Sequence, residues 1–328
     1  MFGNILERIR NQEKQARKAI PSRVFANHFT AIAYRIDANA DKYNLKTIDY
    51  FNTLTSKNTN LERDTLQKLL GNSWSTEYAF QIANEVNNND YYKFSIHWSF
   101  PQAYYSVYLA MTAFHETQGV ANDQHEKSIK LFGNSIKDNH YPSAISFFSK
   151  GLHKEFEFSG LDSFTEIPKD FSVLSNINSI EDAENQIAAF LKSTRKKNAE
   201  HKKERLQKNK DKRFLTATGS YRKNFRAQDW NIIYKSIPQT TICNILYRLR
   251  IKANYRDVET FINADINFKD FHLNIGKIVG YLNFVHEAYI CKVIGVGNYE
   301  NILNNFPERL IENTAKKRFN ELIKPLFE

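Results

Sequence analysis

The segment Phe268–Ile290, FKDFHLNIGKIVGYLNFVHEAYI, carries the strongest helical pattern in the chain. Its large apolar side chains recur at alternating intervals of three and four residues, the spacing of one face of an α-helix. These side chains are Phe268, Phe271, Ile275, Ile278, Leu282, Val285 and Tyr289. The pattern predicts a long helix with one face in the core, which Gly295 and Gly297 end.

A second segment repeats this spacing and ends at Gly119. Its apolar positions are Phe100, Tyr104, Val107, Met111 and Phe114. We expect further helices over residues 1–20, 23–43, 50–87 (in parts, with breaks near 58–60 and 71–73), 126–137, 144–148, 180 into the charged region beyond 192, 242–262 and 307–322. Residues 152–178 lack a period and predict a loop-rich connection. Because no strand pattern stands out, the predicted class is all-α.

Composition narrows the class of protein. In 328 residues there are only 11 glycines and 7 prolines, which favours long helices over turn-rich sheets. Cys243 and Cys291 form no CxxC pair, so neither a disulfide framework nor a thiolate zinc site is expected. No apolar run reaches the length of a membrane span, and the N-terminus lacks an apolar signal core. We therefore expect a soluble cytoplasmic protein that does not contact membrane.

The positive charge is concentrated in one segment. Residues 192–226 hold 14 Lys and Arg against 3 acids, a net +11 that accounts for the whole chain's +10. Such a segment binds polyanions by releasing their counterions. Tyr221, Phe225 and Trp230 lie among or just after these charges, and unpaired bases stack on aromatic rings. The alternatives are a solvated, partly disordered insertion or an anionic membrane surface, and the segment lacks an apolar face for the second.

We predict nucleic-acid contacts from one aromatic and nine basic residues of this segment. They are Lys196, Lys197, Lys202, Lys203, Arg205, Arg213, Tyr221, Arg222, Lys223 and Arg226.

Two pairs of helices resemble HEPN domains. The run AYYSVYLAMTAFHETQGV (Ala103–Val120), followed by HEKSIKLFGNSI (His125–Ile136), is similar to the opening helix pair of that family. The run LYRLRIKANYRDVETF (Leu246–Phe261) resembles its third main helix, and the long helix from Phe268 its closing helix. The resemblance covers about 110 residues in two pieces, and it rests on the order and spacing of these pieces.

The resemblance implies a HEPN-like helical bundle with an N-terminal helical extension and a basic insertion. The expected regions are 1–95 (N-terminal helices), 96–151 (first part of the bundle), 152–240 (insertion with basic segment 192–226) and 241–328 (second part and C-terminal helix). Active HEPN proteins are commonly dimeric and cut RNA without metal or cofactor, leaving a cyclic phosphate. Others only bind RNA or a partner protein, and many serve in toxin–antitoxin or phage-defence systems.

In the resemblance, the family's motif arginine and histidine fall on Arg250 and Tyr255, with Asn254 one turn beyond the arginine. Arginine suits the phosphate because its planar fork donates two hydrogen bonds. The family's proton-transferring histidine is replaced here, and a phenol with a reference pKa of about 10 is a poor base. An active site and an inactive helix of the same shape both remain open.

Two other arginine–histidine pairs have the motif's spacing. Arg195 and His201 lie inside the basic segment, and Arg23 and His28 lie in the predicted second helix. We predict a metal-independent RNA endonuclease whose candidate catalytic residues are Arg250, Asn254, Tyr255, Arg195 and His201. The alternative functions are a non-catalytic protein that binds nucleic acid or a partner protein, and a helical assembly subunit.

Overall fold

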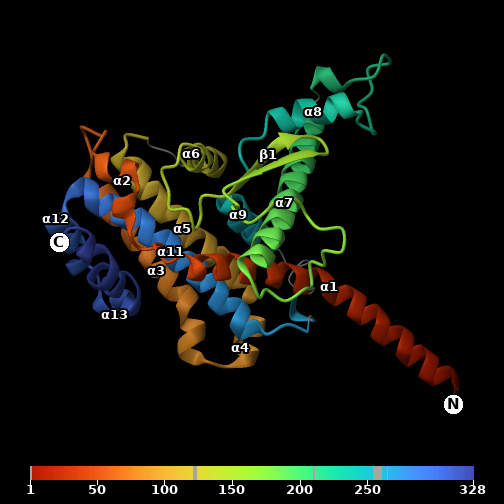
Figure 1. Cartoon of the computed structure of the whole chain (residues 1–328), viewed down its shortest axis with the longest axis horizontal. Coiled ribbons are helices and arrows are strands. Elements are labelled where there is room, and N and C mark those ends of the chain that lie inside the picture. Colours follow the sequence, from red (N-terminus) through yellow and green to blue (C-terminus); the bar gives the residue numbers. More distant parts are fainter. Residues whose placement is uncertain (1, 121–123, 210, 254–260, 264) are drawn as a thin grey trace.

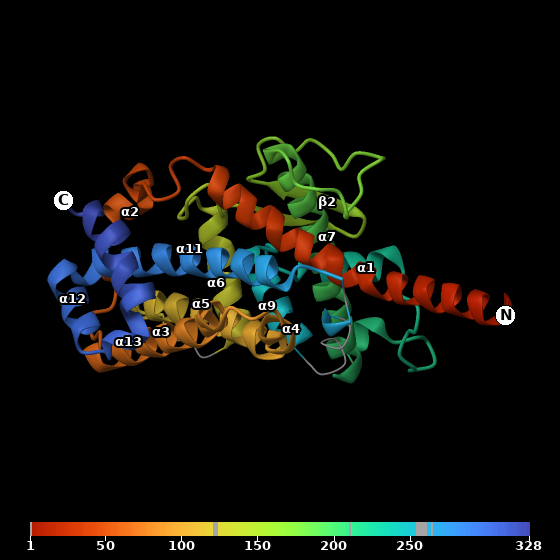
Figure 2. The same ribbon diagram turned by 90° about the horizontal axis from the view of Figure 1, so that it is seen from below.

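The computed structural model describes residues 2–120, 124–209, 211–253, 261–263 and 265–328, and their side chains from residue 20 onward. The chain is mainly helical, as predicted, and its helices pack lengthwise in a bundle from which a lobe and the N-terminal helix project (Figures 1 and 2). In the described parts of the chain, no helix combines the length and the apolar character that crossing a membrane requires.

The first half of the chain is helical up to residue 137. Its helices are α1 (Phe2–Ala38), α2 (Asp49–Thr53), α3 (Arg63–Val86), α4 (Asn89–Phe94), α5 (Ile96–Thr117) and α6 (His125–Lys137). A hairpin, β1 (Phe148–Leu152) and β2 (Glu155–Ser159), follows. The remaining helices are α7 (Ile180–Lys208), α8 (Ala227–Lys235), α9 (Ile242–Lys252), α11 (Phe268–Ile294), α12 (Val296–Asn304) and α13 (Glu308–Ile311). The helical path continues from α13 through π-helical turns, η3 (Glu312–Lys316) and η4 (Phe319–Ile323), to a final turn, η5 (Lys324–Leu326).

Helices α5 and α11 form the centre of the bundle, with α3 packed on α5 and α1 on α11. All five predicted apolar positions of α5 are buried. Of the seven predicted for α11, six are buried and Phe268 is half-buried. Both periodic segments are therefore confirmed as core helices, and residues from α1 to η4 share one apolar core.

Two expected helix breaks are absent. Helix α1 continues through Pro21, although a proline inside a helix removes one backbone hydrogen bond. Helix α3 continues through Gly71, so the break expected there was wrong. The glycine instead makes room for the ring of Phe306. A Cβ at Gly71 would lie 1.8 Å from Cζ of Phe306, so only a residue without a side chain lets that ring approach α3.

The absence of strands was also a wrong expectation. Residues 148–159 form an antiparallel hairpin in which Leu152 pairs with Glu155 across a two-residue turn. Gly151 has φ +98°, and a Cβ there would lie 2.1 Å from the backbone oxygen of Glu155. The short helix expected to end at Gly151 is replaced by this strand because the glycine allows close approach of the second strand.

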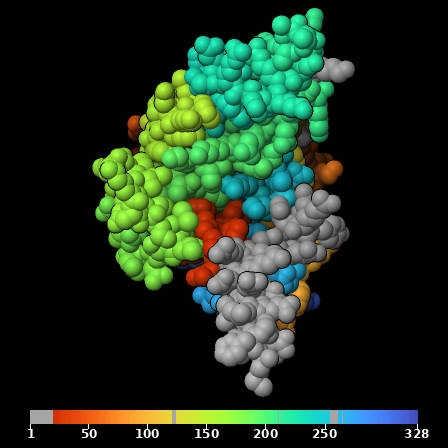
Figure 3. Space-filling model, turned by 90° about the vertical axis from the view of Figure 1, so that its right-hand side faces the viewer, coloured from red at the N-terminus to blue at the C-terminus, as the bar shows by residue number. Residues whose placement is uncertain are grey.

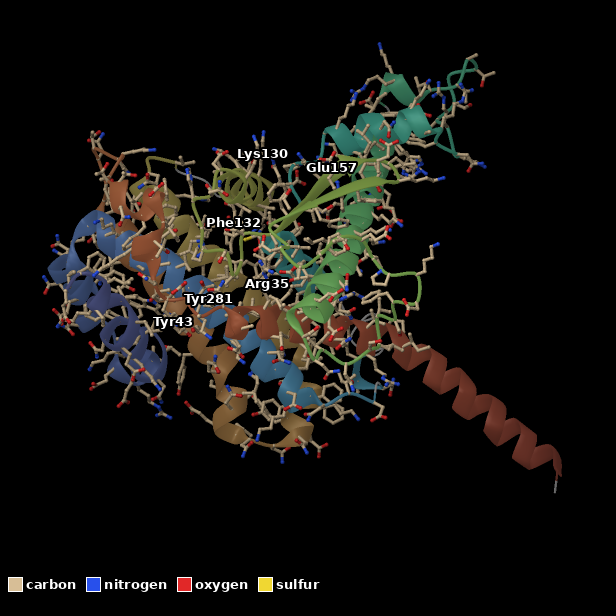
Figure 4. All side chains as sticks on the ribbon, in the orientation of Figure 1. Arg35, Tyr43, Lys130, Phe132, Glu157 and Tyr281 are labelled. Carbon is tan, nitrogen blue, oxygen red and sulfur yellow. The ribbon has the colours of Figure 1, made fainter. Side chains whose placement is uncertain are left out.

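Helix α7 is fastened to α1 by a buried ion pair. Arg35, labelled in Figure 4, pairs with Glu184 and also donates to the backbone oxygen of Gly160 at 2.7 Å. Both charged side chains are almost fully buried. From this anchor α7 runs outward, and its distal half leaves the bundle (Figure 1).

The predicted basic segment folds as a small lobe on the outer half of α7. We call residues 196–237 the basic lobe; Figure 3 shows it in green and cyan at the top of the molecule. Four residues form its own core, separate from that of the bundle: Ala199, Phe214, Ile233 and Tyr234. The described part of the segment is therefore folded, which corrects the partly disordered alternative.

A buried charge network holds the C-terminal helical path against the bundle. Arg318 donates to both oxygens of Glu77, each at 2.9 Å, and to Glu287 at 2.6 and 3.0 Å. Trp74 and Tyr299 also donate to Glu287, at 3.1 and 3.0 Å. The three side chains are at most 7% exposed, so two buried carboxyl groups share one buried cation.

Candidate functional site

Arg250 lies near the end of α9, on the side of this helix that packs against α5. Its guanidinium carbon is 5.8 Å from the ring centre of Tyr104, 5.1 Å from that of Tyr105 and 5.6 Å from that of Tyr247. The rings attract the cation through their π faces. Among the described residues, no carboxylate or carbonyl accepts a hydrogen bond from Arg250, so its half-buried fork has donors for an incoming anion.

His125 shares two of these rings. It begins α6, its Nδ1 lies 2.8 Å from the hydroxyl of Tyr104, and its ring centre is 5.9 Å from that of Tyr247. Partial burial, and then the nearby Arg250 cation, lower the pKa of His125 below its usual value. The imidazole is therefore neutral at neutral pH.

The tyrosine that links the two groups keeps its proton. Burial raises the pKa of Tyr104 well above its usual value. The phenol can donate to Nδ1 of His125 or accept a hydrogen from it, so Nε2 of the neutral ring can carry either the hydrogen or the free lone pair. Arg250 and a neutral imidazole thus lie around the same tyrosine rings. We call this group the Arg250 cluster: Tyr104, Tyr105, His125, Tyr247 and Arg250.

The basic lobe is tied to the same place. Arg205 of α7 donates to both carboxylate oxygens of Glu126, at 2.6 and 2.8 Å, and Glu126 follows His125 directly in α6. This contact connects the outer half of α7 to the helix that carries the imidazole. An anionic polymer bound along the lobe would therefore lie near the Arg250 cluster.

The predicted pair Arg195 and His201 is split between the interior and the surface. Arg195 is 2% exposed, and its terminal nitrogens donate to the backbone oxygens of Pro238 at 2.9 Å and Gly151 at 3.0 Å. It fastens α7 to the hairpin and to the chain after α8, and no phosphate can reach it. His201 is exposed on α7, so the fold puts the two residues in different environments.

The pair Arg23 and His28 is split in the same way. His28 is buried, and its ring stacks on Phe190 with centres 4.2 Å apart. Burial, and to a lesser extent the charge of Arg248, lower the pKa of His28 to about 3. A buried neutral imidazole of this kind belongs to the core, while Arg23 is exposed. Two further candidates, Asn254 and Tyr255, lie outside the described residues.

The predicted nucleic-acid contacts fall into two groups by exposure. The exposed side chains are Lys196, Lys197, Arg205, Arg213, Lys223 and Arg226. The half-buried ones are Lys202, Lys203, Tyr221 and Arg222. Four of the ten form ion pairs within the protein: Lys197 with Glu200, Arg205 with Glu126, Arg213 with Asp211 and Arg222 with Asp229.

The sequence had not singled out the histidine and the tyrosines of the Arg250 cluster as functional. His125 entered only as the first residue of a helix in the family resemblance, and Tyr104 as one position of an apolar stripe. The useful signal was the order of the segments, in which a tyrosine-rich helix, a glycine and a histidine at the next helix start precede an arginine-bearing helix.

Within the described residues, no group of three or more histidines, cysteines or acids is arranged to hold a metal ion. Comparisons of the chain with protein-family models, with curated proteins and with solved structures find no match.

Proposed function

We propose that this protein is a metal-independent RNA endonuclease of HEPN type, with the Arg250 cluster as its active site. The observation that supports the proposal most is the position of Arg250, whose guanidinium has no carboxylate partner among the described residues and faces tyrosine rings shared with the neutral His125. The order of the helices, which resembles HEPN domains, agrees with this assignment, and a toxin or phage-defence role would follow from it.

In the proposed reaction the 2′-hydroxyl of a ribose attacks the adjacent phosphorus, and the 5′-oxygen of the next nucleotide leaves. Arg250 holds the phosphate oxygens and stabilises the charge that develops on them. In the tautomer with its hydrogen on Nδ1, the neutral His125 accepts the 2′-hydroxyl proton on Nε2, while the leaving oxygen takes up a proton from water. The products are a 2′,3′-cyclic phosphate and a 5′-hydroxyl end.

The test is cleavage of total RNA and tRNA by purified protein in EDTA, with the ends of the products identified. We expect cyclic-phosphate ends, and a loss of roughly 10²-fold or more in rate for His125→Gln, the range for removing a proton-transfer group. The rate of Arg250→Ala should fall at least as far, because the cluster then loses the guanidinium that holds the phosphate. His97→Gln is the matched control, because this half-buried histidine of α5 lies outside both the Arg250 cluster and the basic lobe, and the variant should cut normally.

Intact RNA in every reaction would refute the catalytic proposal. If the same preparations still bind RNA in a salt-dependent way, the protein is a non-catalytic binder of nucleic acid. If they do not bind RNA, a helical protein that binds a partner protein becomes the better hypothesis. A cleavage rate that survives both Arg250→Ala and His125→Gln would place the active site elsewhere in the chain.

A further inference from the structure

The aromatic rings of the basic lobe are already stacked. Phe225 lies against Phe214 with ring centres 4.8 Å apart and an angle of 12° between the planes. The ammonium group of Lys203 lies 4.8 Å from the centre of the Phe225 ring. Phe225 therefore packs against another ring and a cation of the lobe itself, and it does not offer a free face to a base.

Trp230 is enclosed in a similar way. The ring of His153, from the turn of the hairpin, is stacked at 5.5 Å with 15° between the planes, and Lys203 lies 5.4 Å from the indole. Lys203 also donates to the backbone oxygen of Lys223 at 3.2 Å, which holds the loop after α7 in place. Tyr221 stacks on Phe225, and its hydroxyl oxygen is buried.

The cations of the lobe, in contrast, face solvent. Six are exposed and, in the part of the chain that the structure describes, form no ion pair: Lys196, Lys208, Lys212, Lys223, Arg226 and Lys235. The lobe that carries them stands out from the bundle (Figures 1 and 3). The described part of the lobe therefore presents an array of exposed positive charges, while its half-buried rings are already stacked on groups of the protein itself.

We infer that the basic lobe binds the phosphate backbone of double-helical RNA without contacting its bases. This inference rests on the proposed function, since it names the substrate class of the same protein. Stacking on an aromatic ring contributes about 1–3 kcal/mol per base to single-strand binding, and this lobe cannot supply that contribution. A duplex presents phosphates at higher density, and its counterion release per contact is greater, at about 0.9 against about 0.7 for a single strand.

The test measures binding by the full chain to 2′-O-methyl RNA, which forms A-form duplexes and has no 2′-hydroxyl to react. A mixed-sequence hairpin is compared with single-stranded oligomers of uridine and of adenosine at several salt concentrations. We expect the hairpin to bind at least tenfold more tightly than either oligomer, and the two oligomers to bind alike.

The lobe variant is Lys212→Gln/Lys223→Gln/Arg226→Gln. With a slope of about 0.9 per contact, each lost contact should weaken hairpin binding by up to roughly eightfold at 0.1 M salt and flatten the salt slope by about one. A matched control removes three exposed charges at the other end of the molecule, Lys46→Gln/Arg309→Gln/Lys317→Gln, and should bind almost as the wild type does.

The inference would be overturned if a single strand bound more tightly than the hairpin, or if the protein strongly preferred uridine or adenosine oligomers over the other. Either result would mean that bases stack on the rings. Equal losses in the lobe variant and the control would also overturn it. The cleavage assay is independent, because the probe cannot be cut. A protein that cuts RNA but fails this test keeps its proposed function, and one that binds the hairpin but never cuts loses it.

Discussion

Four histidines are buried as neutral rings, and together they should make the fold sensitive to mild acid. They are His28, His115, His272 and His286. Burial is the first cause in each case, and it lowers the pKa to about 3 for His28 and His286 and to about 4 for His115 and His272. In the unfolded chain the same rings have a pKa near 6.5.

The direction follows from where the protons bind. As the pH falls below about 6.5, the unfolded chain takes up four protons that the folded protein cannot bind, so the free energy of unfolding falls. Each ring lowers it by about 0.7 kcal/mol between pH 7 and pH 6, hence about 3 kcal/mol for four, and by about 5 kcal/mol in total down to pH 5.5. These values hold for any folded pKa below about 5.

One carboxyl acts in the opposite direction. Burial raises the pKa of Glu287, so the folded protein takes up this proton before the unfolded chain does and regains part of the lost stability. A single such group offsets only part of the effect of four histidines. Since domains are stable by about 5–15 kcal/mol, a protein near the lower limit should unfold by about pH 5.

The assay is urea unfolding followed by circular dichroism at pH 7, 6 and 5.5. In His28→Phe, which keeps a ring against Phe190, the loss between pH 7 and pH 6 should shrink by about 0.7 kcal/mol. His201→Gln, at an exposed position, is the control and should follow the wild type. A free energy of unfolding that stays constant between pH 7 and 5.5 would refute the reasoning, because it would mean that the folded protein protonates these rings.

Three substitutions test other parts of the packing. Arg318→Leu leaves two buried carboxyl groups without their cation and should lower the free energy of unfolding in urea by about 3–5 kcal/mol. Adding Glu77→Gln should recover part of this loss. An unchanged stability would show that the network is not closed in solution. Gly71→Ala forces its new methyl group onto Phe306 and should lower the free energy of unfolding by about 1–3 kcal/mol in the same assay. If α3 were broken at this position, the substitution would be neutral or stabilising. Arg195→Leu leaves several carbonyl oxygens without their donor, so limited proteolysis should cut the basic lobe faster than the bundle; equal rates in variant and wild type would contradict this anchoring role.

Most of the bundle could be predicted because its helices bury one continuous face. The three- and four-residue spacing in α5 and α11 is a local pattern, and burial of that face follows from it. What could not be predicted depends on partners far along the chain. Gly71 appeared to be a helix breaker, because nothing near it in sequence reveals that Phe306 packs there.

The hairpin had a signal that was overlooked. Glu155, Phe156, Glu157 and Phe158 alternate between charged and apolar residues, the period of a strand with one buried face. The preceding pair of phenylalanines also fits a helix, and a run this short is ambiguous on its own. The turn resolves the ambiguity, because Gly151 and Lys154 both have positive φ angles.

The candidate site shows the same limit. Arg250 could be identified from the helix that carries it, but its neighbours Tyr104 and His125 come from helices more than a hundred residues earlier. Spacing along one helix favoured Arg195 with His201, a pair that the fold separates by burying the arginine. The spacing of an arginine and a histidine predicts a catalytic pair poorly, because either residue can instead be buried as part of the core.

The position of Arg318 bears on how the chain is made. Glu77 and Glu287 are translated before Arg318, so a nascent chain that has not yet reached residue 318 holds two carboxylates for which the bundle has no cation. Enclosing them at that stage would bury unpaired charge, which is strongly unfavourable. Full closure of helices α3 and α11 on each other is therefore unfavourable until residue 318 has been made.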